Sequence, residues 1–148
     1  MLMKKSTDKL LDTLRKKPTV EEYLSENKAE LIDCTLPQAL SHLLEEKHLS
    51  KAEVIRSADI DRTYGYQIFD GRKSPSRDKL IMLCFGLGLE LEETQRLLNI
   101  AGLRILYPRD SRDAIICFSI LHHLSLIDTN EILYDKGFRP LGENDPQN

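Results

Sequence analysis

The chain has 148 residues, of which 41% are hydrophobic and 30% are charged, and its formal net charge at pH 7 is −3. This is the balance of an ordinary globular protein. No apolar run is long enough to cross a membrane, and the N-terminus lacks the apolar segment of a secretory signal. The cysteines, Cys34, Cys84 and Cys117, form no Cys-x-x-Cys pair, so we expect reduced thiols and no zinc site. These features predict a cytoplasmic protein without a membrane partner.

Charge is distributed unevenly along the chain. The acidic total argues against nucleic-acid binding, but the distribution of charge matters more than its sum. The local net charge is +4 in residues 1–17, −5 in residues 18–48, +2 in residues 49–79 and −4 in residues 80–148. We therefore expect any surface that faces phosphates to lie in residues 49–79. For the basic residues before Pro18, a solvated helix face is favoured over an arm that contacts the minor groove or the phosphates.

The first 33 residues predict a charged helical arm. Residues 6–17 place three leucines on one helical face, and Pro18 ends this helix. A second helical segment begins at Thr19, and its apolar members are Val20, Tyr23, Leu24 and Leu31.

Two capping boxes mark the starts of the next two helices, since a Ser or Thr followed three residues later by Glu or Gln is typical of a helix N-terminus. Thr35 with Gln38 forms the first, and Ser50 with Glu53 forms the second. The first box is followed by a one-sided apolar stripe, made of Leu36, Leu40, Leu43 and Leu44.

Three further helices are predicted after a short turn at residues 58–60. They cover residues 62–69, a stretch from Ser76 that Gly86 and Gly88 break, and residues 90–100.

An internal repeat with a shift of 35 residues follows. Ser76-Arg77-Asp78 matches Ser111-Arg112-Asp113, and later identities pair Gly102 with Gly137 and Arg104 with Arg139. A period of this length is typical of helix-pair repeats, so we expect two stacked helical hairpins. The second hairpin, residues 107–141, is expected to pack on the first, and residues 142–148 are expected to form a disordered tail.

Four ordered motifs carry a resemblance to a known family. They are Leu49-Ser50-Lys51-Ala52-Glu53-Val54, Ile60-Asp61-Arg62-Thr63, Gly71-Arg72-Lys73-Ser74-Pro75-Ser76 and Leu87-Gly88-Leu89-Glu90-Leu91-Glu92-Glu93. This order resembles the Cro and lambda-repressor (XRE) helix-turn-helix family over about residues 36–101. The resemblance implies an all-α fold. Its core is a lambda-repressor-like five-helix DNA-binding domain at residues 34–106, flanked by the N-terminal arm and the C-terminal hairpin.

The resemblance also assigns a DNA-binding site. It makes residues 62–69 the recognition helix, which lies in the major groove with its N-terminal side chains toward the bases. The expected base contacts are Arg62, Thr63, Tyr66 and Gln67. The expected phosphate contacts are Lys51, Tyr64, Arg72, Lys73 and Arg77.

Several residues depart from the family pattern inside the motif. Ile55 stands where a small Ala is usual, Asp59 stands where the turn usually has Gly, and Gly65 stands where an apolar core residue is usual. A left-handed Asp and a mid-helix Gly both cost stability. We expect Tyr64 or Phe69 to fill the space over Gly65, with Phe69 in the core.

Two functions are compatible with these patterns. The first is a sequence-specific transcriptional regulator that binds double-stranded DNA as a homodimer, with half-sites about 34 Å apart. The second is a protein-interaction adaptor that keeps the fold without binding DNA, which the acidic net charge and the departures at Asp59 and Gly65 favour. A partner would use the arm or the C-terminal hairpin, whose apolar residues exceed what one helix face can hide: Ile115, Ile116, Phe118, Ile120 and Leu121.

No catalytic constellation or cofactor motif is present in the sequence, so we do not expect an enzyme. The histidine pair His122-His123 consists of neighbours that do not share a helix face, and no further ligand stands at metal-binding spacing.

Overall fold

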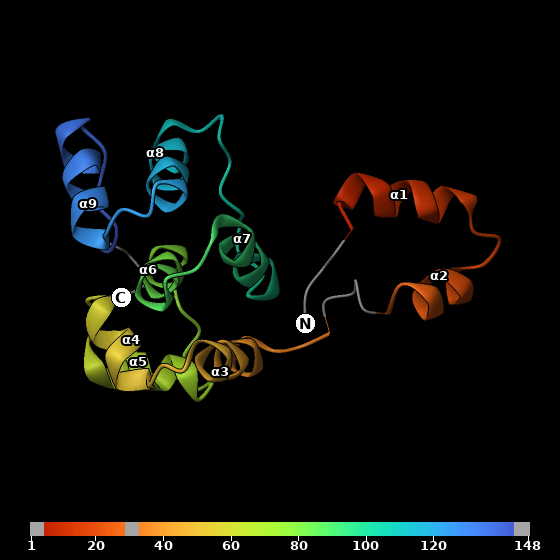
Figure 1. The fold of residues 1–148 in the computed structure, drawn as a ribbon, viewed down its shortest axis with the longest axis horizontal. Coiled ribbons are helices and arrows are strands. Elements are labelled where there is room, and N and C mark those ends of the chain that lie inside the picture. Colours follow the sequence, from red (N-terminus) through yellow and green to blue (C-terminus); the bar gives the residue numbers. More distant parts are fainter. Residues whose placement is uncertain (1–4, 29–32, 144–148) are drawn as a thin grey trace. The chain divides into compact units, whose positions relative to one another are not determined.

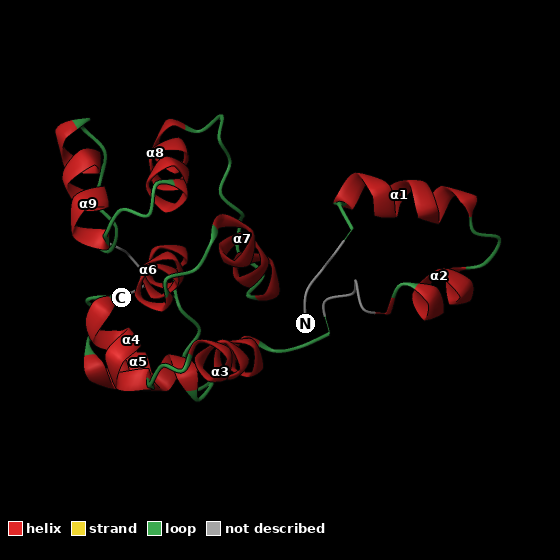
Figure 2. Cartoon of the chain, in the orientation of Figure 1, coloured by secondary structure: helices red, strands yellow, loops and turns green. Residues whose placement is uncertain are grey.

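The computed structural model describes residues 5–28 and 33–143, which form α-helices and no strand (Figures 1 and 2). The nine helices are α1 (Thr7–Lys16), α2 (Val20–Glu26), α3 (Leu36–Lys47), α4 (Lys51–Ser57), α5 (Arg62–Phe69), α6 (Arg77–Leu87), α7 (Leu91–Ile100), α8 (Ser111–Leu121) and α9 (Leu126–Asp135). The prediction of an all-α protein is confirmed. Among the described helices, none has the length and apolar character needed to cross a membrane.

The chain divides into two compact units, Met1–Asp33 and Cys34–Asn148. In the first unit, the Ser6 and Thr19 hydroxyls cap α1 and α2, and Tyr23 is buried. Among the described residues of this unit, four large apolar side chains are exposed: Leu11, Leu14, Val20 and Leu24. Leu31, which was expected to extend the apolar face of α2, lies outside the described residues.

Both predicted capping boxes are formed in the second unit. The Thr35 amide donates to Gln38 Oε1 at 2.9 Å, and the Gln38 amide donates to Thr35 Oγ1 at 3.3 Å. The Ser50 amide donates to Glu53 Oε1 at 3.3 Å, and the Glu53 amide donates to Ser50 Oγ at 3.2 Å. These bonds satisfy amides that a helix N-terminus otherwise leaves without partners, and they fix the starts of α3 and α4.

Helix α6 is the centre of this unit. It packs against α3, α4, α7 and α9 (Figure 1). Five consecutive side chains in its middle are buried: Leu80, Ile81, Met82, Leu83 and Cys84. A helix that is apolar on all sides is stable in water only when other elements surround it.

The contact between α4 and α5 depends on Ile55 and Gly65. A Cβ atom built on Gly65 would lie 2.7–2.8 Å from three side-chain carbons of Ile55. Ile55 therefore occupies the space that a larger residue at position 65 would need. The expectation that Tyr64 or Phe69 fills this space was wrong, because the complementary residue lies on the neighbouring helix.

A second close approach joins α4 to α6. A Cβ atom on Gly86 would lie 2.6 Å from the carbonyl oxygen of Val54. Gly86 was expected to help break its helix, but α6 continues to Leu87 and ends at Gly88, which has a left-handed φ of 67°. Gly86 instead lets the two backbones approach each other.

Two equivalent ion pairs join the two repeats. The Arg77 guanidinium donates to both carboxylate oxygens of Asp113, at 3.0 and 2.8 Å, and the Arg112 guanidinium donates to both oxygens of Asp78, at 3.2 and 3.0 Å. Each repeat thus supplies the arginine for the aspartate of the other. Reciprocal contacts of this kind indicate a two-fold relation. The hairpins α6–α7 and α8–α9 therefore face each other about a pseudo-two-fold axis, whereas stacked repeats would be related by translation.

Other contacts occur twice in the same way. Arg77 Nε donates to the carbonyl of Arg104 at 2.8 Å, and Arg112 Nε donates to that of Arg139 at 2.9 Å. Within each hairpin, one side-chain amide pairs with the backbone of a leucine eleven residues later; the pairs are Gln95 with Leu106 and Asn130 with Leu141. Equivalent residues of the two repeats therefore form equivalent hydrogen bonds.

The start of the predicted disordered tail is ordered. The Gly142 amide donates to Asp78 Oδ2 at 3.1 Å, and Arg139 Nη1 donates to the same oxygen at 2.6 Å. Arg139 Nη1 also donates to the carbonyl of Glu143 at 3.1 Å. These bonds correct the prediction at residues 142 and 143, while residues 144–148 of that tail lie outside the described chain.

Hydrogen bonds control the acidity of the two aspartates. Burial alone would raise their pKa values. The hydrogen bonds from Arg112 and the Gly142 amide to Asp78 outweigh this effect, as do those from Arg77 and the Tyr107 amide to Asp113. The pKa of each carboxyl group is therefore held below its usual value, and the charged form is favoured in the folded state.

We predict that Gly65→Ala destabilises the native protein but is neutral or stabilising in an Ile55→Ala background. Overpacking a core costs about 1–3 kcal/mol, and replacing a helical Gly by Ala returns about 1 kcal/mol. Removing the Ile55 side chain abolishes the clash and leaves only the propensity gain. Urea unfolding of the four variants in the double-mutant cycle tests this; the same effect of Gly65→Ala in both backgrounds would contradict it.

We also predict that the exchanged ion pairs make stability depend on acid pH. Because the folded pKa values are lowered, the stabilisation is fully present above the unfolded value of about 3.9 and is lost as pH falls toward the folded values. Asp113→Asn should reduce the free energy of unfolding at neutral pH by about 3 kcal/mol, since it leaves the Arg77 guanidinium with backbone carbonyls but without its opposite charge. It should also flatten the pH dependence between neutral and acid solution, measured by urea unfolding. An unchanged acid slope would exclude Asp113 as a source of this dependence.

Candidate nucleic-acid interface

The turn between α4 and α5 is defined by three residues. Asp59 has a left-handed φ of 55°, Ile60 is buried, and the Asp61 carboxylate accepts the Tyr64 amide at 3.1 Å as the cap of α5. The left-handed residue reverses the chain, and the buried isoleucine holds the turn on the core. Asp59 therefore adopts the left-handed conformation that was expected to cost stability at this position.

The outer face of α5 carries the predicted base contacts. Arg62 and Thr63 are exposed, and Tyr66 and Gln67 are half-buried. Residues three and four apart are neighbours on a helix surface, so these four side chains form one group. The Arg62 guanidinium carbon lies 5.8 Å from the centroid of the Tyr66 ring, within range of a cation–π contact.

The inner face of α5 holds the helix on the core. Gly65, Ile68 and Phe69 are buried. The expectation that Phe69 is a core residue is confirmed. Because one face is buried in this way, α5 is oriented with the group that begins at Arg62 toward solvent.

The predicted phosphate contacts differ in their surroundings. Lys73 is exposed and Lys51 is half-buried. Arg72 is exposed, but its guanidinium pairs with Asp70 at 2.7 Å. Hydrogen bonds from the side chain and the backbone of Arg72 hold the pKa of Asp70 below its usual value. Sequence reasoning missed this pairing, because it depends on the conformation of the turn after α5.

Two predicted phosphate contacts are corrected by the structure. The Arg77 side chain is 17% exposed, and its guanidinium donates to Asp113 and to the carbonyls of Arg104 and Ile105. Tyr64 packs against the core with its hydroxyl oxygen buried. Both side chains therefore stabilise the fold and are not presented to a phosphate.

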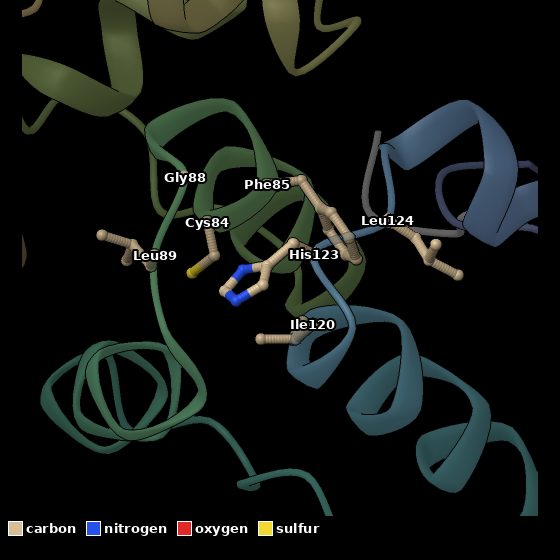
Figure 3. Close-up of a pocket in the computed structure, with 7 residues that line it drawn as sticks. All are labelled: Cys84, Phe85, Gly88, Leu89, Ile120, His123 and Leu124. Atoms are coloured by element: carbon tan, nitrogen blue, oxygen red, sulfur yellow. The ribbon is translucent and has the colours of Figure 1, made fainter.

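The second unit also contains a small cleft, where the C-terminal ends of α6 and α8 meet (Figure 3). Its volume is about 200 Å³, below the range of about 300–1,000 Å³ that is usual for small-molecule sites. The lining residues are Cys84, Phe85, Gly88, Leu89, Ile120, His123 and Leu124. Burial raises the pKa of the Cys84 thiol to about 12, so this thiol is protonated at neutral pH.

Comparisons with known proteins add no assignment. No family model, no curated protein and no solved structure matches the chain. Within the described residues, no group of three or more His, Cys, Asp or Glu side chains is placed to hold a metal ion. The outer face of α5 is the candidate site because it gathers Arg62, Thr63, Tyr66 and Gln67 on a helix whose other face is buried.

We predict that Asp59→Gly stabilises the protein by about 1 kcal/mol, because glycine adopts the left-handed conformation without the penalty of a side chain. Asp59→Ala is the matched control, since it removes the carboxylate but keeps the Cβ atom and the strain. Urea unfolding measures both variants. Equal stabilisation by Gly and Ala would show that the charge, and not the backbone, is the cause.

Proposed function

We propose that the chain is a sequence-specific DNA-binding transcriptional regulator of the helix-turn-helix type. In this proposal, α3–α7 form a lambda-repressor-like five-helix domain that inserts α5 into the major groove. The observation that carries it is the outward group of Arg62, Thr63, Tyr66 and Gln67 on a helix whose opposite face is buried.

The chemistry of this group suits base recognition. An arginine can donate two hydrogen bonds to guanine, and a glutamine can form a donor and an acceptor bond with adenine. A threonine contacts either a base edge or a thymine methyl group. The contact between Arg62 and Tyr66 restricts the arginine side chain, which lowers the conformational entropy lost on binding.

A protein-interaction adaptor is the second candidate. It is favoured by the neutralisation of Arg72 by Asp70 and by the burial of the Arg77 guanidinium in an internal ion pair. Both contacts reduce the positive charge next to α5, on which binding to any duplex depends. The two candidates differ in one measurable property, the affinity for DNA at low salt.

We expect the purified protein to retard genomic DNA fragments at low salt and to lose affinity steeply as salt rises. On a fragment recovered by repeated selection, Arg62→Ala should weaken binding by about 1–3 kcal/mol, the usual value of one bidentate base contact. Arg109→Ala is the matched control, since it removes the same charge from an exposed position outside α4 and α5. Fluorescence anisotropy measures the dissociation constants.

The outcomes separate the candidates. A loss of affinity that is confined to Arg62→Ala supports direct base recognition by α5. Equal losses for both variants would indicate a general charge effect and would contradict sequence-specific binding by this helix. No retardation at low salt would exclude the regulator and leave the adaptor.

A further inference from the structure

The pseudo-two-fold relation allows each face of α8 to be compared with the matching face of α6. In α6, Leu83, Gly86 and Leu87 share the face that packs against α4. Leu83 and Leu87 are buried, and Gly86 faces the backbone of α4. This face is part of the core that holds the helix-turn-helix unit.

The matching face of α8 has no such cover. A shift of 35 residues places Phe118, Leu121 and His122 on it, and we call these three residues the α8 face. Phe118 is 51% exposed, Leu121 is 58% exposed, and His122 is exposed too. The ring centroids of Phe118 and His122 lie 4.1 Å apart, so these two rings contact each other. The second hairpin therefore presents an apolar surface where the first hairpin has its core.

The exposed apolar residues of α9 differ from the α8 face in what their counterparts do. Ile127 and Tyr134 on α9 are 77% and 72% exposed. Their counterparts on α7 are Glu92 and Asn99, which are also exposed. These two positions face solvent in both hairpins, so the comparison singles out the α8 face.

The charge of the α8 segment fits contact with a second copy of the same chain. Residues 114–127 contain no Asp, Glu, Lys or Arg. A two-fold contact brings the same surface region of both copies together. A charged residue in that region would therefore lie close to a like charge. Leu121 stands where α6 has Gly86, so this face suits packing through protruding side chains and not the close backbone approach made by α4.

We propose that two copies of the chain associate through their α8 faces. In Figure 1, α4 and α5 lie on the side of α6 that is away from α8. A contact made through α8 therefore leaves both α5 helices accessible. If the proposed function also holds, such a dimer joins two separate DNA segments and does not occupy adjacent half-sites.

The oligomeric state of the full chain tests the contact without any DNA. In sedimentation equilibrium from low to high micromolar concentration, we expect the unmodified protein to form dimers. Leu121→Lys should raise the dimer dissociation constant by about tenfold or more, since two ammonium groups would meet across the interface. Tyr134→Lys is the matched control, because it places the same charge in the last turn of the other helix of the hairpin. It should leave the dimer intact.

A second variant, Phe118→Lys, should dissociate the dimer as Leu121→Lys does, and circular dichroism checks that each variant is folded. A monomer at every concentration of the unmodified protein would overturn the proposal. It would also be overturned if Leu121→Lys and Tyr134→Lys dissociated the dimer equally, or if neither variant dissociated it.

A capture assay separates this inference from the proposed function. An immobilised genomic duplex should retain a second, labelled duplex when the unmodified protein is added, and Leu121→Lys should bind DNA without joining two duplexes. A dimer that binds no DNA would contradict the regulator and leave the α8 contact standing. DNA binding by a protein that stays monomeric would contradict the α8 contact alone.

Discussion

The exchange of arginine and aspartate between the two hairpins is the interaction on which the second unit depends. Asp78 and Asp113 lie in the first turns of α6 and α8. Each carboxylate accepts hydrogen bonds from both Nη atoms of an arginine of the other hairpin. Both carboxylates are buried, so removing one partner would leave a charge that water cannot solvate. The same contacts anchor the loops after α7 and α9 through the backbone groups of Tyr107 and Gly142.

A steric match sets the orientation of α5 within this frame. Ile55 and Gly65 are departures from the pattern of the proposed helix-turn-helix class, and they fit each other at the crossing of α4 and α5. The large residue of one helix lies over the small residue of the other, and close packing of the two helices is kept. Arg62 and its neighbours on α5 can therefore face solvent despite both departures.

Local signals in the sequence predicted the helices and the exposed face of α5. Capping boxes depend on residues three apart, and helical faces depend on residues three and four apart, so both can be recognised in one stretch of chain. The role of Arg77 could not be predicted in this way, because its partner Asp113 lies 36 residues further along. The repeat placed the two residues in equivalent motifs, but it did not show that the hairpins are related by rotation. Gly65 and Ile55 were both noticed, and their pairing required the crossing of two helices.

The central position of α6 has a consequence for the dynamics of the molecule. One side of this helix completes the core beneath α4, and its N-terminal turn takes part in the ion-pair exchange with α8. Hydrogen-exchange protection usually follows such shared elements, because they open only when the surrounding structure opens. The amides of α6 should thus exchange last. If the C-terminal hairpin loosens, α6 should lose protection too, and with it the α4 helix against which α5 packs.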